Sequence, residues 1–293
     1  MTDVTDLLGR AARLLDRLEA LLPSAPVAPD WDAHAFRWRR DGRGQGRLHA
    51  LSHPQRLALK DLLCLDRQKA EILRNSQQFL AGRGANNVLL WGSRGTGKSS
   101  LIKAIFNELR HQGLRLIEMD KDELVDLPEV LDLIHGRPER FIIFCDDLSF
   151  EANESSYKAL KAVLEGSISA APDNLLIYAT SNRRHLLPEF QRENQEARLI
   201  DGEIHPGESS EEKISLSDRF GLWVSFHPFT QDQYLTIVHH WLGRLGAEVR
   251  APERVDPAAL RWALQRGSRS GRTAWQFARD WAGRGEEAGD GVT

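Results

Sequence analysis

Apolar residues follow two alternating patterns along this chain of 293 residues. Short continuous apolar runs are typical of strands that are buried on both faces. Between them, apolar residues recur every three or four positions, as on one face of a helix. This alternation predicts an α/β fold with a parallel five-stranded αβα core. Its strands are expected at residues 88–91, 114–119, 141–145, 175–180 and 222–226.

The α/β core is predicted to occupy residues 86–228, followed by a small all-helical segment at 229–285, which the family resemblance given below implies is a lid, and by a tail at 286–293. Residues 188–213 form a polar, acid-rich insert in the core, interpreted either as a contact for a partner or as a solvated loop. The lid is expected to contain three helices with a tryptophan core. The predicted helices lie near 231–245, 257–267 and 272–281, and the tryptophans are Trp241, Trp262, Trp275 and Trp281.

The N-terminus is predicted to begin with an amphipathic helix over residues 1–22, because leucines and alanines share one helical face. A proline-rich linker follows at 23–30. The leucine spacing also suits a coiled coil, although over few turns. Two interpretations stay open: the helix packs on the protein's own body or a neighbouring subunit, or it binds a dedicated partner helix.

Residues 31–85 are predicted to form an N-terminal extension that leads into the nucleotide site. Phe36 and Trp38 alternate with arginines, which predicts a half-buried strand that ends in a turn. The same mixture of aromatic and basic residues over 31–47 would also suit single-stranded nucleic acid. A helical pattern covers 54–80, and residues 65–68 within it are candidate contacts for a nucleotide base.

The first apolar run of the core ends in a sequence with the spacing G-x-x-x-x-G-K-S/T, which is typical of a phosphate-binding loop. It reads Gly92, Ser93, Arg94, Gly95, Thr96, Gly97, Lys98, Ser99 and Ser100. The glycines allow a tight turn whose N–H groups converge near the positive end of the next helix. Lys98 can reach the outer phosphates, and the hydroxyl of Ser99 can ligate Mg²⁺. The sequence therefore predicts a nucleotide site.

Two other predicted strands end in polar side chains that belong to the same site. The third run ends at Asp146 and Asp147, and the fourth leads to Asn182. Since ligands gather at the carboxyl ends of parallel strands, these residues are expected beside the loop. Asp146 is the candidate Mg²⁺ ligand, and Asp147 is the candidate that orients or deprotonates water. Glu151 is a weaker candidate for that role, and Asn182 could instead serve only as a turn residue.

Composition changes this picture little. Thirty-nine basic and 42 acidic residues give a formal charge of −3, so nucleic-acid or membrane binding would need a local basic patch. Cys64 and Cys145 lack metal-ligand spacing, which favours a reducing compartment. With no apolar run of membrane-spanning length and no secretion-signal layout, we expect a cytoplasmic protein without membrane contact.

Taken in order, these motifs resemble those of the AAA+ ATPases, a branch of the P-loop NTPases. The segment SLSDRFG at 215–221 is similar to the one that carries the arginine finger of that class. The segment GSRSGRTAWQF at 267–277 is similar to the lid helix with its second sensor arginine. Together with FCDDLSFE and IYATSNRRHL, these motifs resemble one bacterial AAA+ family filed as a domain of unknown function, over roughly residues 31–285.

The resemblance implies that residues 92–100 hold ATP, that Ser99 and Asp146 hold Mg²⁺, and that Asp147 polarises water together with Asn182. A glutamate is more frequent in AAA+ proteins where Asp147 stands. Because aspartate is one methylene shorter and a base must lie within about 3 Å of its water, slow hydrolysis is expected.

The resemblance also assigns roles to two arginines. Arg272 would touch the γ-phosphate from the lid, and Arg219 would reach the site of a neighbouring subunit in a ring-like or helical homo-oligomer. Two classes of function follow. The protein could be an ATPase that drives assembly or remodelling of an unknown protein or nucleic-acid client, or an ATP-gated oligomerisation switch with very slow hydrolysis. A small-molecule kinase is disfavoured, since no acceptor pocket is evident.

Overall fold

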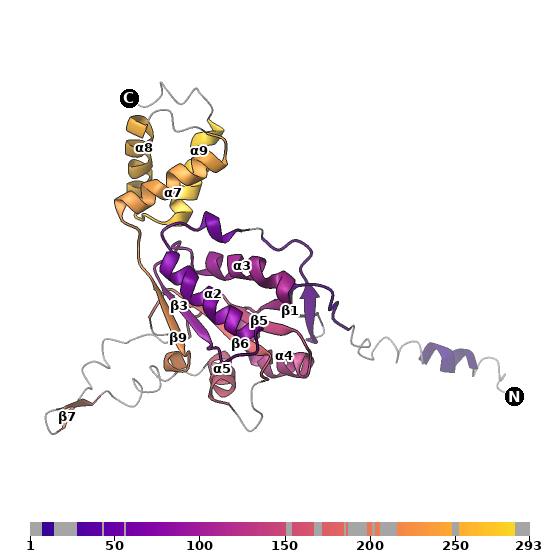
Figure 1. Ribbon diagram of the computed structural model, residues 1–293. Coiled ribbons are helices and arrows are strands. Elements are labelled where there is room, and N and C mark those ends of the chain that lie inside the picture. Colours follow the sequence, from indigo (N-terminus) through magenta and orange to yellow (C-terminus); the bar gives the residue numbers. More distant parts are fainter. Residues whose placement is uncertain are drawn as a thin grey trace.

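A computed structural model describes residues 8–14, 28–42, 44–55, 57–150, 154–166, 172–184, 186, 198–200, 203–205, 216–247 and 252–284. Its centre is a seven-stranded sheet of spatial order β2-β1-β4-β5-β6-β3-β9. Helices cover both faces of this sheet, and three further helices stand beyond one of its ends (Figure 1).

The five predicted strands are all present and run parallel. In spatial order they are β4 (Leu114–Glu118), β5 (Arg140–Cys145), β6 (Leu175–Ser181), β3 (Val88–Gly92) and β9 (Leu222–Phe226). Although β3 comes first of the five in the chain, it lies between β6 and β9. The chain runs from β3 toward β4 and from β6 toward β9, so the carboxyl ends of β3 and β6 form a topological switch point, where open α/β sheets place ligands. This position is called the crevice below.

The sheet is wider than the five strands predicted. Strand β1 (Ala35–Arg40) pairs parallel with β4, and β2 (Gly46–Ala50) pairs antiparallel with β1. These strands extend the main sheet, so the half-buried strand and the turn predicted from Phe36 and Trp38 are confirmed, and the N-terminal extension is helical only in its second half. The alternating pattern explains the result, because Phe36 and Trp38 lie two residues apart and point to the same buried side.

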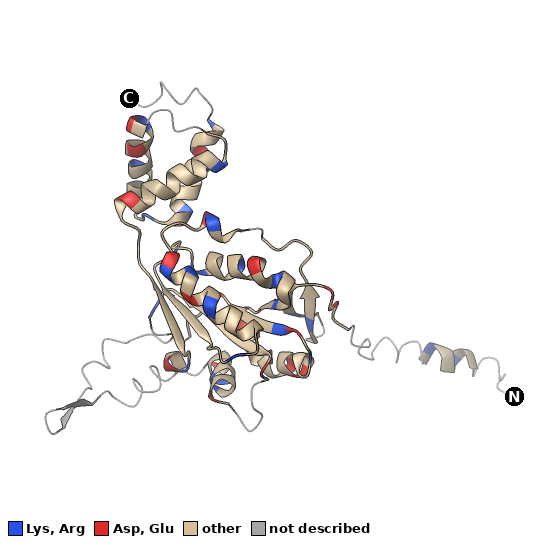
Figure 2. Cartoon of the chain, in the orientation of Figure 1, with Lys and Arg blue, Asp and Glu red and all other residues tan. Residues whose placement is uncertain are grey.

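The aromatic and basic residues of β1 are used inside the protein. Phe36 and Trp38 are 0% and 1% exposed, so neither ring can stack on a base, and the nucleic-acid interpretation is wrong for these residues. The indole of Trp38 donates to Asp126 Oδ2 at 2.9 Å, and Arg40 forms an ion pair with the same carboxylate. The Arg40 guanidinium lowers the pKa of Asp126 although burial opposes it. Acidic and basic residues are interspersed along the described helices (Figure 2).

Two helix layers bury the two faces of the sheet. Helices α2 (Asp66–Leu80) and α3 (Lys98–Leu109) cover one face, and α4 (Leu127–Ile134) and α5 (Ser155–Glu165) cover the other. In β3, Val88 and Leu90 join the first core, whereas Leu89 joins the second. Burial on both faces is why these strands are continuous apolar runs.

The lid consists of α7 (Gln231–Arg244), α8 (Pro252–Gln265) and α9 (Gly271–Gly283). The predicted tryptophan core is only partly correct: Trp241, Trp262 and Trp281 pack against the buried core, but all four tryptophans are only partly buried themselves. Small side chains allow the helices to approach closely, and the indoles pack around the margin; Trp241 and Trp275 meet edge to face at 4.7 Å. The buried lid residues include Tyr234, Val238, Ala259, Ala263, Ala274, Phe277 and Ala278.

Helix α7 is tied to the segment that precedes α2. Asp61, in the short helix η1 (Leu59–Asp61), is only 6% exposed. Its Oδ1 lies 3.3 Å from His240 Nε2 and 3.5 Å from Arg244 Nε, both on α7. These polar contacts join helix α7 of the lid to the segment before α2.

The remaining predictions fall on segments that are described only in part. Residues 8–14 are helical, and Leu8 and Leu14 are 63% and 59% exposed, so both interpretations of the N-terminal helix stay open. Strands β7 (Arg198–Ile200) and β8 (Glu203–His205) form an antiparallel pair within the polar insert. Glu151 and the tail lie outside the described residues. No described helix has the length and apolar character needed to cross a membrane.

Candidate nucleotide-binding site

The phosphate-binding loop connects β3 to α3, as its sequence predicts. Helix α3 begins at Lys98, directly after Gly97, which has a left-handed φ of 103°. The loop is braced from within: the buried Thr96 donates its hydroxyl to the Ser93 carbonyl at 2.8 Å, and Ser93 N donates to the Phe226 carbonyl at 3.2 Å. Because α3 begins directly after the loop, the free N–H groups of its first turn, including those of Ser99 and Ser100, point toward the loop.

Replacement of Gly92 by alanine is expected to prevent formation of this loop. Gly92 has a φ of 133°, and a Cβ there would lie 1.9 Å from the Phe226 carbonyl oxygen on β9. We expect destabilisation of more than about 4 kcal/mol, because backbone atoms cannot yield as a side chain does.

Gly113→Ala is the matched control for Gly92→Ala. Gly113 has a φ of 100° but no atom within 4 Å of its Cβ position, so only the backbone strain of about 1–2 kcal/mol applies. Chemical denaturation of both variants measures the difference. Equal losses of stability would show that the β9 contact is unimportant.

Lys98 is buried against the loop and points toward the crevice. Its Nζ donates to the carbonyls of Gly92 at 2.6 Å and Ser93 at 2.8 Å, and to Asn182 Oδ1 at 3.2 Å. All three ammonium protons thus have acceptors. Burial lowers the pKa of Lys98, while Asp147 and then Asp146 act in the opposite direction. A phosphate oxygen would replace these weaker acceptors with a charged one.

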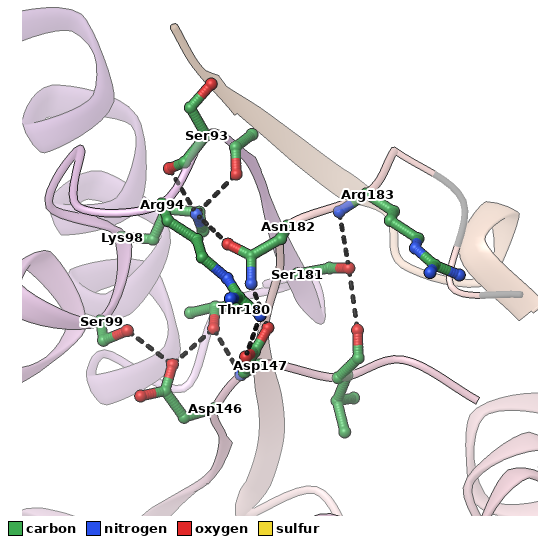
Figure 3. Close-up of polar contacts among 12 residues, drawn as sticks. Ser93, Arg94, Lys98, Ser99, Asp146, Asp147, Thr180, Ser181, Asn182 and Arg183 are labelled. Carbon is green, nitrogen blue, oxygen red and sulfur yellow. Dashed lines mark hydrogen bonds and ion pairs between the residues drawn. The ribbon is translucent and has the colours of Figure 1, made fainter. Parts of the chain in front are cut away.

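Ser99, Asp146 and Thr180 form a compact group of oxygen atoms below the loop (Figure 3). Asp146 Oδ1 accepts from the Ser99 hydroxyl at 2.5 Å and from the Thr180 hydroxyl at 2.6 Å. Mg²⁺ prefers oxygen ligands, so Ser99 and Asp146 fit the predicted metal site. Among the described residues, no cluster of three His, Cys, Asp or Glu side chains could hold a metal. A nucleotide would therefore have to contribute ligands.

Asp147 lies at the mouth of the crevice in a left-handed conformation with a φ of 53°. Its backbone N–H donates to Thr180 Oγ1 at 2.9 Å, which fixes this turn against β6. Its Oδ1 accepts from the Asn182 side-chain amide, and its Oδ2 lies 3.5 Å from the Arg94 guanidinium. Such a conformation is costly for aspartate, and strain of this kind is common at functional sites.

The lid reaches the loop through the first turn of α9. Ser270 caps this helix by accepting from Thr273 N at 3.2 Å, and Arg272 N lies 3.4 Å from the Gly95 carbonyl. A Cβ on Gly95 would lie 2.8 Å from Ser270 Oγ, so only glycine permits this approach. Arg272 contributes to lowering the pKa of Lys98, which places its charge near the site.

A cavity of about 750 Å³ opens between the loop and the lid, within the size range of small-molecule sites. The loop contributes Ser93, Arg94 and Thr96, and the lid contributes apolar residues of α8 and the turn before α9. The cavity therefore joins the two parts that the sequence predicts to grip the nucleotide.

Among the predicted site residues that the structure describes, Arg219 lies away from the others. It precedes β9, which runs parallel to β3, so it lies at the end of the sheet opposite the loop. The five residues of β9 separate the two ends by about 16 Å. Arg219 forms an ion pair there with Glu165, at the end of α5. It therefore lies too far from the phosphate-binding loop of its own chain to contact it.

Two contributors to the site were not predicted from the sequence. Thr180 bonds to Asp146 and Asp147, and Ser270 packs on the loop. A signal for Thr180 exists in the sequence, since it is a hydroxyl residue at the end of an otherwise apolar strand, two residues before Asn182. No comparable signal marks Ser270, because its role depends on how the lid folds back onto the core.

Comparison with known proteins places the chain in a family. Residues 31–285 match the family described as "Protein of unknown function (DUF815)". The chain belongs to this family. No curated protein matches the sequence. The family resemblance predicted from the motifs is thereby confirmed.

Solved structures share the fold of this family member. The Aeropyrum pernix ORC1 protein in complex with DNA has a TM-score of 0.53 and 14% identity, over 78% of this chain and 61% of that one. Lower scores are found for the Thermotoga maritima RuvB Holliday junction branch migration motor (0.43; 12% identity; 77% and 72% covered) and a DNA replication initiation factor (0.46; 17%; 76% and 62%). At such identities the likeness concerns the fold alone, which is the predicted P-loop AAA+ fold.

Proposed function

We propose that this protein binds ATP with Mg²⁺ and hydrolyses it to ADP and phosphate. The observation that carries this proposal is the convergence of residues from three strand ends and the lid on one crevice. Lys98 follows β3, Asp147 follows β5, Asn182 follows β6, and Arg272 begins α9 beside the loop. An arrangement of this kind supplies both of the means by which phosphoryl transfer is catalysed, positioning and charge stabilisation.

Each residue has a role that its present contacts support. Lys98 would leave its carbonyl acceptors for the outer phosphates, and Ser99 and Asp146 would hold Mg²⁺. The ion would neutralise charge on the phosphates when bound. Asp147 would orient the attacking water and accept its proton, and Asn182, which contacts both Lys98 and Asp147, would fix their relative position. Arg272 would reach the γ-phosphate from the lid.

Arg219 gives the proposal a second part, in which copies of the chain assemble. Because Arg219 cannot reach its own loop, we infer that it completes the site of a neighbouring copy in a ring-like or helical homo-oligomer. Hydrolysis would then be coupled to assembly or to remodelling of a protein or nucleic-acid partner. The reducing cytoplasm, which suits the free thiols of Cys64 and Cys145, is the proposed location.

One observation favours a second function, an ATP-gated oligomerisation switch with very slow hydrolysis. Both carboxylate oxygens of Asp147 already have partners, Asn182 on one and Arg94 on the other. A base occupied in this way is poorly placed to take a proton from water. Assembly driven by ATP with near-zero steady-state turnover would support the switch, whereas repeated turnover stimulated by a partner would support the ATPase.

Titration calorimetry with ATP and ADP in the presence of Mg²⁺ tests the proposal directly. We expect saturable binding near one nucleotide per chain, and we expect Lys98→Ala to lose most of the ATP affinity because the outer phosphates lose their cation. Absence of adenine-nucleotide uptake by pure, folded wild-type protein would refute nucleotide binding and both functions built on it.

A further inference from the structure

Arg94, in a variable position of the phosphate-binding loop, reaches across the mouth of the crevice. Its NH2 lies 3.5 Å from Asp147 Oδ2, while Asn182 occupies the other oxygen of that carboxylate (Figure 3). Arg94 thus links the loop to the residue proposed to activate water. The loop consensus and the family resemblance place Arg94 among the residues around the nucleotide, but neither assigns its side chain a part in hydrolysis.

The Arg94–Asp147 pair is held loosely enough to be exchanged. The two side chains are 76% and 56% exposed, and exposed ion pairs contribute little stability. By contrast, a guanidinium binds phosphate through two parallel, charge-assisted hydrogen bonds. A terminal phosphate in the loop would therefore compete effectively with Asp147 for Arg94.

We propose that Arg94 is a catalytic residue that acts on the γ-phosphoryl group within its own chain. When ATP fills the loop, Arg94 moves from Asp147 to the γ-phosphate, and the same movement frees Asp147 Oδ2 for the attacking water. ADP lacks this phosphate, so Arg94 stays on Asp147 in the ADP-bound protein. This inference rests on the proposed nucleotide site and adds a third arginine, supplied in cis from the loop, to Arg272 of the lid and Arg219 of a neighbouring copy.

The step that Arg94 assists is hydrolysis of the terminal phosphoanhydride. The water oxygen forms a bond to the γ-phosphorus, and the bond from that phosphorus to the bridging oxygen breaks, with its electron pair remaining on ADP. The water proton passes to Asp147 and then to the released phosphate. Charge on the transferred group and on the bridging oxygen is what a fixed guanidinium stabilises in the transition state.

Arg94→Ala is expected to lower kcat about a hundredfold, the usual effect of removing one such donor. The variant should bind ATP at least about tenfold more weakly than wild type does. The same loss is expected for ADP combined with aluminium fluoride, which imitates the transferring group. The affinity for ADP alone should stay within about threefold of wild type. Arg94→Lys keeps the charge but not the planar fork, so partial recovery is expected. Calorimetry provides these affinities independently of turnover.

Mixing variants tests whether Arg94 acts in cis. A chain with Lys98→Ala retains Arg94 but cannot hold ATP well, so its addition to Arg94→Ala should restore no activity. Recovery in this mixture would overturn the cis assignment. Arg74→Ala, which removes an exposed arginine of α2, is the matched control and should leave binding and turnover unchanged.

The remaining outcomes separate this inference from the function on which it rests. Unchanged or increased kcat in Arg94→Ala, with an unaltered ratio of ATP to ADP affinity, would overturn the inference alone. Equal weakening of ATP binding and ADP binding would show that Arg94 contributes only general positive charge to the loop, and this result would also overturn the inference. Failure of wild type to bind nucleotide would remove the proposed function as well. Thermal unfolding of each variant establishes that it is folded.

Discussion

Replacement of Asp147 by asparagine is expected to lower ATP turnover by about a hundredfold or more and to leave ATP binding intact. Asparagine keeps the size and planar shape of the side chain and one of its two acceptor oxygens, but it cannot accept a proton from water, and general-base catalysis typically contributes at least this factor. Binding should persist because the loop, Lys98 and Ser99 are untouched. Phosphate release at steady state gives turnover, and calorimetry gives affinity.

Two further variants make the Asp147→Asn result specific. Asp132→Asn changes an exposed aspartate of α4 in the same isosteric way and should have no effect. Asp146→Asn should instead weaken the dependence on Mg²⁺, since Asp146 shares its Oδ1 with Ser99 and Thr180. Unchanged turnover in Asp147→Asn would move the role to Glu151, and Glu151→Gln would then be the variant to measure.

The sheet could largely be predicted from the sequence because burial on both faces requires unbroken apolar runs. The five central strands satisfy that condition, and each follows or precedes a clear helical pattern. Strand β1 does not, since Arg37, Arg39 and Arg40 interrupt it. The strand tolerates these arginines because they form ion pairs with acidic residues that lie some 80 residues away in the chain and come close only in the folded protein. The partners are Glu118, Asp120 and Asp126.

The site could be predicted where it depends on the ends of strands, and less well where it depends on loops and the lid. Lys98, Asp146, Asp147 and Asn182 follow parallel strands, so topology alone brings them together. The contact between Arg94 and Asp147 requires the conformation of two turns, one of them left-handed at Asp147. The lid core was predicted only in part because large aromatic residues were favoured over the alanines that allow close helix packing.

Replacement of Arg219 by alanine is expected to lower turnover by about a thousandfold under conditions in which wild type assembles. The side chain lies at the far end of β9 from its own loop and is held by Glu165, so its effect on hydrolysis must come through another copy. Affinity for ATP in the isolated chain should be unchanged. Turnover per chain of wild type should rise with protein concentration, and that of Arg219→Ala should stay low and constant.

Complementation between two inactive variants provides the decisive form of this test. Arg219→Ala chains retain the phosphate-binding loop, and Lys98→Ala chains retain Arg219, so a mixed assembly contains interfaces in which an intact loop meets an intact arginine. Activity should therefore appear in the mixture, at a level set by the fraction of such interfaces, whereas each variant alone stays inactive. A fully active wild-type monomer in light scattering and kinetics would contradict the arrangement. If the mixture stays inactive although the two variants are shown to co-assemble, Arg219 does not act on a neighbouring site and its role is limited to the ion pair with Glu165. Activity in the mixture can arise only if the arginine of one chain completes the site of another.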